Sequence, residues 1–279
     1  MELRNRVALV TGASRGVGAA TAVALAAAGC HVACAARSTL DAPQRTPGVL
    51  EDTVARVKEL GCDGLAVPTN LAVESEVEAM VAATFDHFGR IDILVNNAAI
   101  SFPGNLDIAT KRYELMMRVN LHAPLVATRQ VAGIMRQRGE GGAILNVSSI
   151  AALYPFPGQM VYGMSKIALE RFTVDAAMQL EEDRIAVNCF RIDLPVASEG
   201  SLANSPDMDH SGWEPSEVAA EGILWMLEQP ASYSGRLVSM CELREQQGIM
   251  PSRVAESYRS PNFRTDLING LVARDQAFF

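Results

Sequence analysis

Seven short apolar segments alternate with longer amphipathic segments along most of the 279-residue chain. Each apolar segment is a continuous run, which is typical of a strand buried on both faces of a parallel sheet. This alternation predicts an α/β fold, a doubly wound seven-stranded parallel sheet with helices on both faces. The predicted strands are 6–12, 31–37, 64–70, 91–98, 142–149, 185–192 and 235–240, and the predicted helices are 16–28, 49–60, 73–88, 107–138, 160–182 and 215–228.

Two longer stretches fall outside this alternation. Residues 193–214 contain two prolines and little periodicity, and a loop of this length inside a compact domain is more often functional than idle. We therefore expect 193–214 to act as a lid over a bound ligand. Residues 249–279 mix polar and apolar side chains without a clear period. The chain is predicted to form one domain, 1–248, followed by a C-terminal tail, 249–279.

The composition, 49% hydrophobic and 20% charged, suits a soluble protein with a sizeable core. A net charge of −8 argues against nucleic acid or an anionic membrane as a partner. No apolar run is long enough to cross a bilayer, and the chain enters its first predicted strand too early to leave room for a signal peptide. We expect a cytoplasmic protein with no membrane partner.

The cysteines do not predict a metal site. All five lie in apolar segments without a C-x-x-C pair, and are expected to be reduced core residues. Cys30 and Cys34 have a spacing that could suit a metal on a helix, but the residues between them are predicted to form a strand. The cysteines are Cys30, Cys34, Cys62, Cys189 and Cys241.

A glycine-rich turn, TGASRGVG, follows the first predicted strand and precedes a predicted helix. Gly12, Gly16 and Gly18 would let the backbone pass close to a pyrophosphate, which the free amides and dipole of the helix N-terminus favour. The spacing differs from the usual G-x-G-x-x-G fingerprint. Its place between strand and helix nevertheless predicts a dinucleotide site at the carboxyl edge of the sheet.

Two arginines indicate which dinucleotide is bound. An acidic residue at the end of the second strand would bind the ribose 2′-hydroxyl of NAD, but Ala36 and Arg37 stand there. Arg15 lies inside the glycine turn. Two guanidinium groups suit a 2′-phosphate, so NADP(H) is the predicted cofactor. NAD(H) is the alternative, in which the two arginines are only surface residues.

Tyr162 lies four residues before Lys166, one of three lysines in the chain. Residues i and i+4 share one face of a helix. A nearby ammonium favours the phenolate, so the pair predicts a tyrosine whose pKa is lowered for proton transfer. The alternative is a chance pairing on a helix surface.

Together with NNAA (96–99), Asn120 in RVNLHAP and NVSS (146–149), these motifs resemble the short-chain dehydrogenase/reductases, a family with a Rossmann-type fold. The resemblance covers residues 5 to about 245, and Ser149 lies 13 residues before Tyr162, the spacing typical of that family. Within the family, the chain looks most similar to hydroxysteroid-dehydrogenase-like proteins and terpenoid-alcohol dehydrogenases.

The resemblance implies a role for each motif residue. Tyr162 would deliver a proton to the substrate oxygen as hydride arrives from the nicotinamide, or remove it in the reverse direction. Lys166 would lower the tyrosine pKa and bind the nicotinamide ribose, Ser149 would hydrogen-bond the carbonyl, and Asn120 would hold a water linking Lys166 to solvent. The expected cofactor contacts are Gly12, Ser14, Arg15, Gly16, Val17, Gly18, Arg37, Asn70, Leu71, Asn97, Ala98, Tyr162, Lys166, Val196 and Ser198.

The chain departs from the family pattern at several positions. Ala99 replaces a usual glycine, and Asn70 stands where an aspartate usually accepts a hydrogen bond from the adenine amino group. Ile192 and Asp193 replace a Pro-Gly turn near the nicotinamide, and Ser198 is the expected substitute for the threonine that follows it.

These observations predict an NADP(H)-dependent oxidoreductase, acting on CH–OH groups, that interconverts a carbonyl and an alcohol. Apolar residues near the presumed site suit a small lipid-, terpenoid- or steroid-like substrate. The alternatives are an NAD-dependent catabolic alcohol dehydrogenase and a non-catalytic cofactor-binding regulator. Helices 107–138 and 160–182 are too apolar for solvent on two faces, and the matching helices of the family pair between subunits, so a homodimer or homotetramer is expected. The apolar residues that are expected near the substrate are Phe102, Phe156, Met160, Leu194, Leu202 and Trp213.

Overall fold

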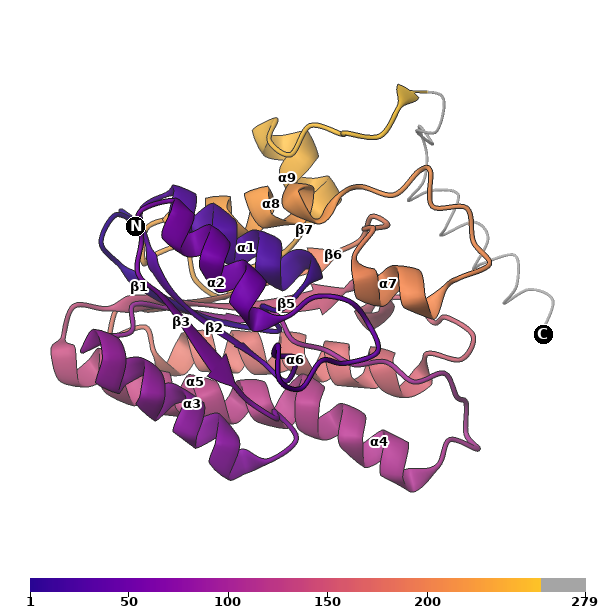
Figure 1. Ribbon diagram of the computed structural model, residues 1–279, viewed down its shortest axis with the longest axis horizontal. Coiled ribbons are helices and arrows are strands. Elements are labelled where there is room, and N and C mark those ends of the chain that lie inside the picture. The colour runs from indigo at the N-terminus through magenta and orange to yellow at the C-terminus, as the bar shows by residue number, and fades with distance from the viewer. Residues whose placement is uncertain (257–279) are drawn as a thin grey trace.

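A computed structural model describes residues 1–256 of the chain (Figure 1). Its centre is one seven-stranded sheet in the order β3-β2-β1-β4-β5-β6-β7, in which every neighbouring pair is parallel. The predicted fold class and all seven predicted strands are confirmed. The strands are β1 (Val7–Thr11), β2 (His31–Ala36), β3 (Gly64–Pro68), β4 (Ile93–Asn96), β5 (Gly142–Ser149), β6 (Ile185–Ile192) and β7 (Leu237–Ser239).

Helices cover both faces of the sheet, and each face has its own hydrophobic core. Along β1, Ala8 and Val10 belong to one core and Leu9 to the other. This two-sided burial is the reason that the strands are continuous apolar runs in the sequence. One face carries α1 (Gly16–Ala27), α2 (Leu50–Glu59) and α8 (Ser216–Glu228), and the other carries α3 (Glu74–Phe88), α5 (Ala123–Arg138) and α6 (Met160–Gln179) (Figure 1).

The predicted helix 107–138 is interrupted once. It consists of α4 (Thr110–Met117), one π-helical turn at Arg118–His122, and α5. Isolated π-helical turns occur often at functional sites. Here the turn contains Asn120, a residue singled out by the sequence.

Two short helices of the structure were not predicted from the sequence. The segment predicted to be an irregular loop, 193–214, contains α7 (Glu199–Asn204), and β7 leads directly into α9 (Met240–Gln247). Helix α9 begins with a capping box, in which the Ser239 hydroxyl accepts from the Glu242 N–H while the Glu242 carboxylate accepts from the Ser239 N–H. The S-x-x-E pattern was a readable helix signal, whereas the six residues of α7 are too few to show a period.

The first residues of the predicted tail pack on the domain. Met250 is buried, and the backbone N–H of Arg253 donates to the buried Glu214 carboxylate at 2.9 Å. The rest of the predicted tail, 257–279, lies outside the described residues. Among residues 1–256, no helix is both long enough and apolar enough to cross a membrane.

A buried carboxylate ties together the amino edge of the sheet. Asp92 precedes β4, is 1% exposed, and accepts from the Val7 N–H at 2.9 Å. Arg90 contacts both of its carboxylate oxygens, at 2.7 and 2.6 Å, and Arg138 and Arg6 reach it at 3.2 and 3.3 Å. Burial alone would raise the pKa of Asp92, but these hydrogen bonds and arginine charges lower it overall. The network joins the start of β1, the start of β4 and the end of α5.

Candidate active site

The carboxyl ends of β1, β4, β5 and β6 lie next to one another along one edge of the sheet. The chain crosses from β1 to β2 on one side and returns to β4 on the other, so this edge contains the switch point of the doubly wound fold. The residues that the sequence analysis singled out follow these strand ends. The candidate site is built there.

The glycine turn after β1 has the backbone that its sequence requires. Gly12 and Gly16 have φ angles of +69° and +56°, a region that favours glycine. At Gly18 a Cβ atom would lie 2.3 Å from the Gly12 carbonyl oxygen and 2.4 Å from Asn97 Nδ2. Asn97 Nδ2 donates to the Thr11 carbonyl at 2.8 Å, so its amide holds the glycine turn against the end of β4.

The predicted arginine pair comes together beside this turn. Arg15 donates from Nη2 to the Gly48 carbonyl at 3.0 Å, while its buried Nε has no hydrogen-bond partner. Arg37 is exposed at the end of β2. Burial lowers the pKa of Arg15, the nearby Glu199 carboxylate raises it, and the charge of Arg37 lowers it further. Two cations therefore share one corner of the site, and one of them offers an unused donor.

The segment after β6 covers the glycine turn. Ser198 caps α7 by accepting from the Ser201 N–H at 3.1 Å. A Cβ on Gly16 would lie 2.9 Å from Ser198 Cβ and 3.4 Å from Glu199 Oε2. That Glu199 oxygen is buried without a hydrogen-bond partner. Glu199 was not predicted from the sequence, because it belongs to no motif.

Three predicted catalytic residues converge at the carboxyl end of β5 and the start of α6. Ser149 ends β5, and Tyr162 and Lys166 lie in the first two turns of α6. The Lys166 ammonium lies 5.6 Å from the centre of the Tyr162 ring and donates to the Val147 carbonyl at 2.8 Å. Lys166 is 2% exposed. The i, i+4 prediction of a shared helix face thus agrees with the structure.

The ionisation of the pair differs from the expectation. Burial raises the pKa of Tyr162, and a hydrogen bond with Ser149 only partly opposes this. The net direction is upward, opposite to the lowering by Lys166 expected from the sequence, because burial penalises the phenolate. Burial also lowers the pKa of Lys166 to about 8, against the opposing effects of Cys189 and Glu170. A neutral phenol is the form that can donate a proton.

Asn120 connects the segment after β4 to α6. Its Oδ1 accepts from the Ile100 N–H, and its Nδ2 donates to the Ile100 carbonyl, both at 2.9 Å. Nδ2 also reaches Ser165 Oγ at 3.0 Å. These contacts fix the loop next to Tyr162, while the water-holding role expected for Asn120 stays a prediction.

The remaining predicted cofactor residues follow the carboxyl ends of β1, β3, β4 and β6. Asn70 Oδ1 accepts from the Ala72 N–H at 3.2 Å, and the Ala98 N–H donates to Thr11 Oγ1 at 3.1 Å. The other four side chains are buried: Ser14, Val17, Leu71 and Val196.

The altered turn after β6 has a structural explanation. Asp193, which stands where the family usually has glycine, is buried and accepts from the Cys241 N–H at 3.0 Å. Cys241 lies in the first turn of α9, where a carboxylate stabilises the helix N-terminus. The unusual acid therefore joins the end of β6 to α9.

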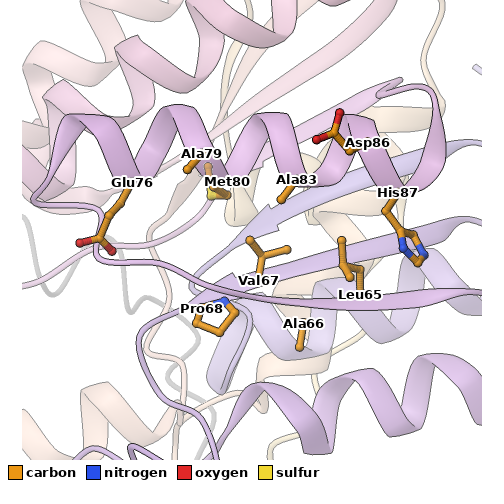
Figure 2. Close-up of a pocket in the computed structure, with 10 residues that line it drawn as sticks. All are labelled: Leu65, Ala66, Val67, Pro68, Glu76, Ala79, Met80, Ala83, Asp86 and His87. Carbon is orange, nitrogen blue, oxygen red and sulfur yellow. The ribbon is translucent and has the colours of Figure 1, made fainter.

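A surface groove lies on the β3 side of the sheet. It runs between β3 and α3, and Leu65 and Val67 point from the strand toward the helix (Figure 2). His87 at one end of the groove contacts Asp63 at 2.8 Å. None of the predicted catalytic or cofactor residues lines it.

Comparisons with known proteins identify the family and the fold. The family model described as short chain dehydrogenase matches residues 6–193. Dehydrogenase/reductase SDR family member 4 of Sus scrofa is 35% identical over 189 residues, 67% of this chain and 64% of that protein. A solved structure from Xanthomonas campestris is 31% identical, with a TM-score of 0.80 over 90% of this chain and 92% of the other. L-Sorbose reductase from Gluconobacter frateurii, solved with NADPH and L-sorbose, is 26% identical, with a TM-score of 0.76 over 86% and 97%.

The close approach at Gly18 predicts a strong effect of one methyl group. Gly18→Ala should destabilise the protein by about 2 kcal/mol, because the new atom overlaps the Gly12 carbonyl and Asn97. The matched control is Gly133→Ala on α5, where an added Cβ meets no atom within 4 Å. That variant should be neutral or stabilising by up to about 1 kcal/mol. Urea denaturation of both variants is the measurement, and equal stabilities would contradict this description of the turn.

Proposed function

The chain belongs to the short-chain dehydrogenase/reductase family, and on that premise we propose that it is an NADP(H)-dependent oxidoreductase that interconverts a carbonyl and an alcohol. The observation that carries the proposal is the convergence of Ser149, Tyr162 and Lys166 at the edge of the sheet that also carries the glycine turn. A cofactor-binding regulator would need the turn but not these three residues. A panel of carbonyls and alcohols, assayed at the nicotinamide absorbance with both cofactors, tests the proposal, and no turnover with any of them would contradict it.

The residues at the edge fit a dinucleotide. The missing side chain at Gly18 lets the glycine turn pack closely against the start of α1, where the free backbone amides would accept a pyrophosphate. The unpartnered Arg15 Nε and the exposed Arg37 would hold a 2′-phosphate. When bound, the cofactor supplies or accepts the hydride.

The protein side chains handle the proton and the carbonyl oxygen. Tyr162, neutral because burial raises its pKa, would donate its proton to the substrate oxygen in the reducing direction. Ser149 lies next to this phenol and would donate a hydrogen bond to the same oxygen. Lys166 carries a positive charge below about pH 8 and would stabilise the phenolate left after proton transfer.

The segment 193–214 would close the site over an apolar substrate. Its two ends are fixed to each other, because the Glu214 N–H donates to the Pro195 carbonyl at 2.9 Å and the Ala197 N–H to the Glu214 carbonyl at 2.8 Å. Between these two ends, Leu202 and Trp213 are only partly buried. Four further apolar residues, at the start of the segment or in other parts of the chain, are also partly buried. This surface supports a small lipid-, terpenoid- or steroid-like substrate. The four residues are Phe102, Phe156, Met160 and Leu194.

Exposed apolar residues support a homodimer or homotetramer. On α6, Ile167 and Met178 are 52% and 72% exposed, and Leu125 on the adjacent α5 is 38% exposed. Burying this face against a second copy would remove it from water. Light scattering should give a multimeric mass for the wild type and a smaller mass for Ile167→Asp. Leu60→Asp, at the end of α2 on the other face of the sheet, should leave the mass unchanged, and a monomeric wild type would contradict the proposal.

Removing the proposed acid should abolish most of the chemistry without unfolding the protein. Tyr162→Phe is expected to lower kcat by about 10²–10⁴, the usual effect of a placed general acid, with cofactor affinity near that of the wild type. Tyr113→Phe on α4, which removes a hydroxyl from a partly exposed tyrosine, is the control. Steady-state turnover of Tyr162→Phe within threefold of the wild type would exclude this role.

Cofactor preference should depend on the two arginines. If both bind the 2′-phosphate, each charge-assisted contact contributes about 1.5–3 kcal/mol, so NADPH should bind at least about 10²-fold more tightly than NADH. Arg37→Asp should reverse this, because the carboxylate repels a phosphate and accepts from a free 2′-hydroxyl. Arg56→Asp on α2 makes the same charge change at a different exposed position. Dissociation constants for both cofactors are the measurement, and a wild type that binds them equally would contradict the assignment.

A further inference from the structure

We propose that Glu170 and Arg191 form a buried positioning pair in which Arg191 holds the Glu170 carboxylate in place and that carboxylate keeps Lys166 in its charged form. The proposal rests on the proposed function for its catalytic meaning, but the pair acts on Lys166 whether or not turnover occurs. Neither residue belongs to a motif identified in the sequence. Their effect is expected through Lys166 and not through contact with substrate.

The pair is closely bonded. Glu170 Oε1 accepts from Arg191 Nε at 2.9 Å, and Oε2 accepts from Arg191 Nη2 at 2.7 Å. Ser148 Oγ donates to Oε1 at 2.7 Å. Glu170 is 4% exposed and Arg191 6% exposed. The two charges thus lie in the interior, with three donors on one carboxylate.

The pair lies next to the catalytic lysine in the fold. Glu170 follows Lys166 by four residues on α6, so both side chains leave the same face of the helix. Ser148 precedes Ser149 on β5, and Arg191 lies opposite Ser148 in the register of β5 with β6. The carboxylate is therefore held between the helix that carries Tyr162 and Lys166 and the strand that carries Ser149.

Holding α6 against β6 does not require charges. When an ion pair is buried, the loss of solvation energy is about as large as the attraction between the two charges. Apolar residues of the same volume therefore often stabilise a protein as well or better. What an apolar pair could not provide is a negative potential at a buried ammonium. Burial favours the neutral amine of Lys166, and the Glu170 carboxylate opposes that effect.

No other described charge near Lys166 takes the same role. Burial raises the pKa of the Cys189 thiol on β6 to about 12, which leaves it neutral at physiological pH, and Tyr162 is also neutral. The Val147 carbonyl of β5 is an uncharged acceptor. The charged side chains of α4 and the π-helical turn, which also pack against α6, are exposed: Lys111, Arg112, Glu114, Arg118 and His122.

The two members of the pair should act on Lys166 with opposite signs. Glu170→Gln leaves the Arg191 cation without its counter-ion, so Lys166 should lose its proton at a pH lower by roughly one unit. Arg191→Gln leaves the Glu170 carboxylate uncompensated, so the same midpoint should rise by roughly one unit. A purely structural pair predicts similar losses of stability in both variants and no opposite shifts.

The titration of Lys166 can be followed directly by NMR of the full chain labelled with ¹³Cε-lysine. The chain has only three lysines, and the exposed Lys58 and Lys111 serve as internal references. Lys166→Arg assigns the third signal. This readout needs no substrate, so a failure of the proposed function would appear as absent turnover with the Lys166 shifts intact. In an active enzyme, the alkaline limb of kcat/KM should move with the NMR midpoint.

Two further variants keep the test decisive. Glu170→Gln combined with Arg191→Gln leaves no orphaned buried charge, and its midpoint should lie below that of the wild type and above that of Glu170→Gln. Asp92→Asn removes a buried, arginine-bound carboxylate at the far edge of the sheet, and should cost stability without moving the midpoint. The proposal would be overturned by shifts in the same direction in the two single variants, or by a double variant that titrates as the wild type does.

Discussion

All seven strands of this sheet run in the same direction, so all seven carboxyl ends meet along one edge. Every functional group described above depends on that constraint. It brings the glycine turn after β1, Asn97 after β4, Ser149 at the end of β5 and the segment after β6 to the same edge, where the proposed ligand would bind. The side chains come from positions spread over about 190 residues, and only the parallel order of the sheet brings them together.

A polar layer inside the protein fixes how α6 lies on this edge. Lys166, Glu170 and Thr173 recur along one side of α6, and each meets a polar group of the sheet. Thr173 accepts from Asn146 Nδ2 at 2.9 Å, and Asn146 in turn accepts from Asn96 Nδ2 at 2.9 Å. Apolar side chains tolerate small shifts of one element along another, but this set of directional bonds does not. Tyr162 is therefore positioned by interactions that lie well below the catalytic surface.

The sequence predicted the features that leave a local pattern. Buried strands leave continuous apolar runs, and the glycine turn leaves a spacing that its backbone explains. The capping box of α9 could also have been identified from its S-x-x-E sequence pattern. The pair Glu170 with Arg191 left no pattern, because it joins residues of no motif across a distance set only by the fold, and Glu199, which lies near Arg15, belongs to no motif either. The direction of the Tyr162 pKa was unpredictable for the same reason, since burial is a property of the folded chain.

The network around Asp92 lies at the opposite edge, where the strands begin. Strand β5 has eight residues, so its two ends lie more than about 20 Å apart. Substitutions at such separations, with no shared partners, change the free energy of folding almost additively. The residues that stabilise the amino edge of the sheet can therefore be changed independently of those at the proposed site. An engineer could reshape the 193–214 segment for a new substrate and recover lost stability at the amino edge, without either change reaching the other.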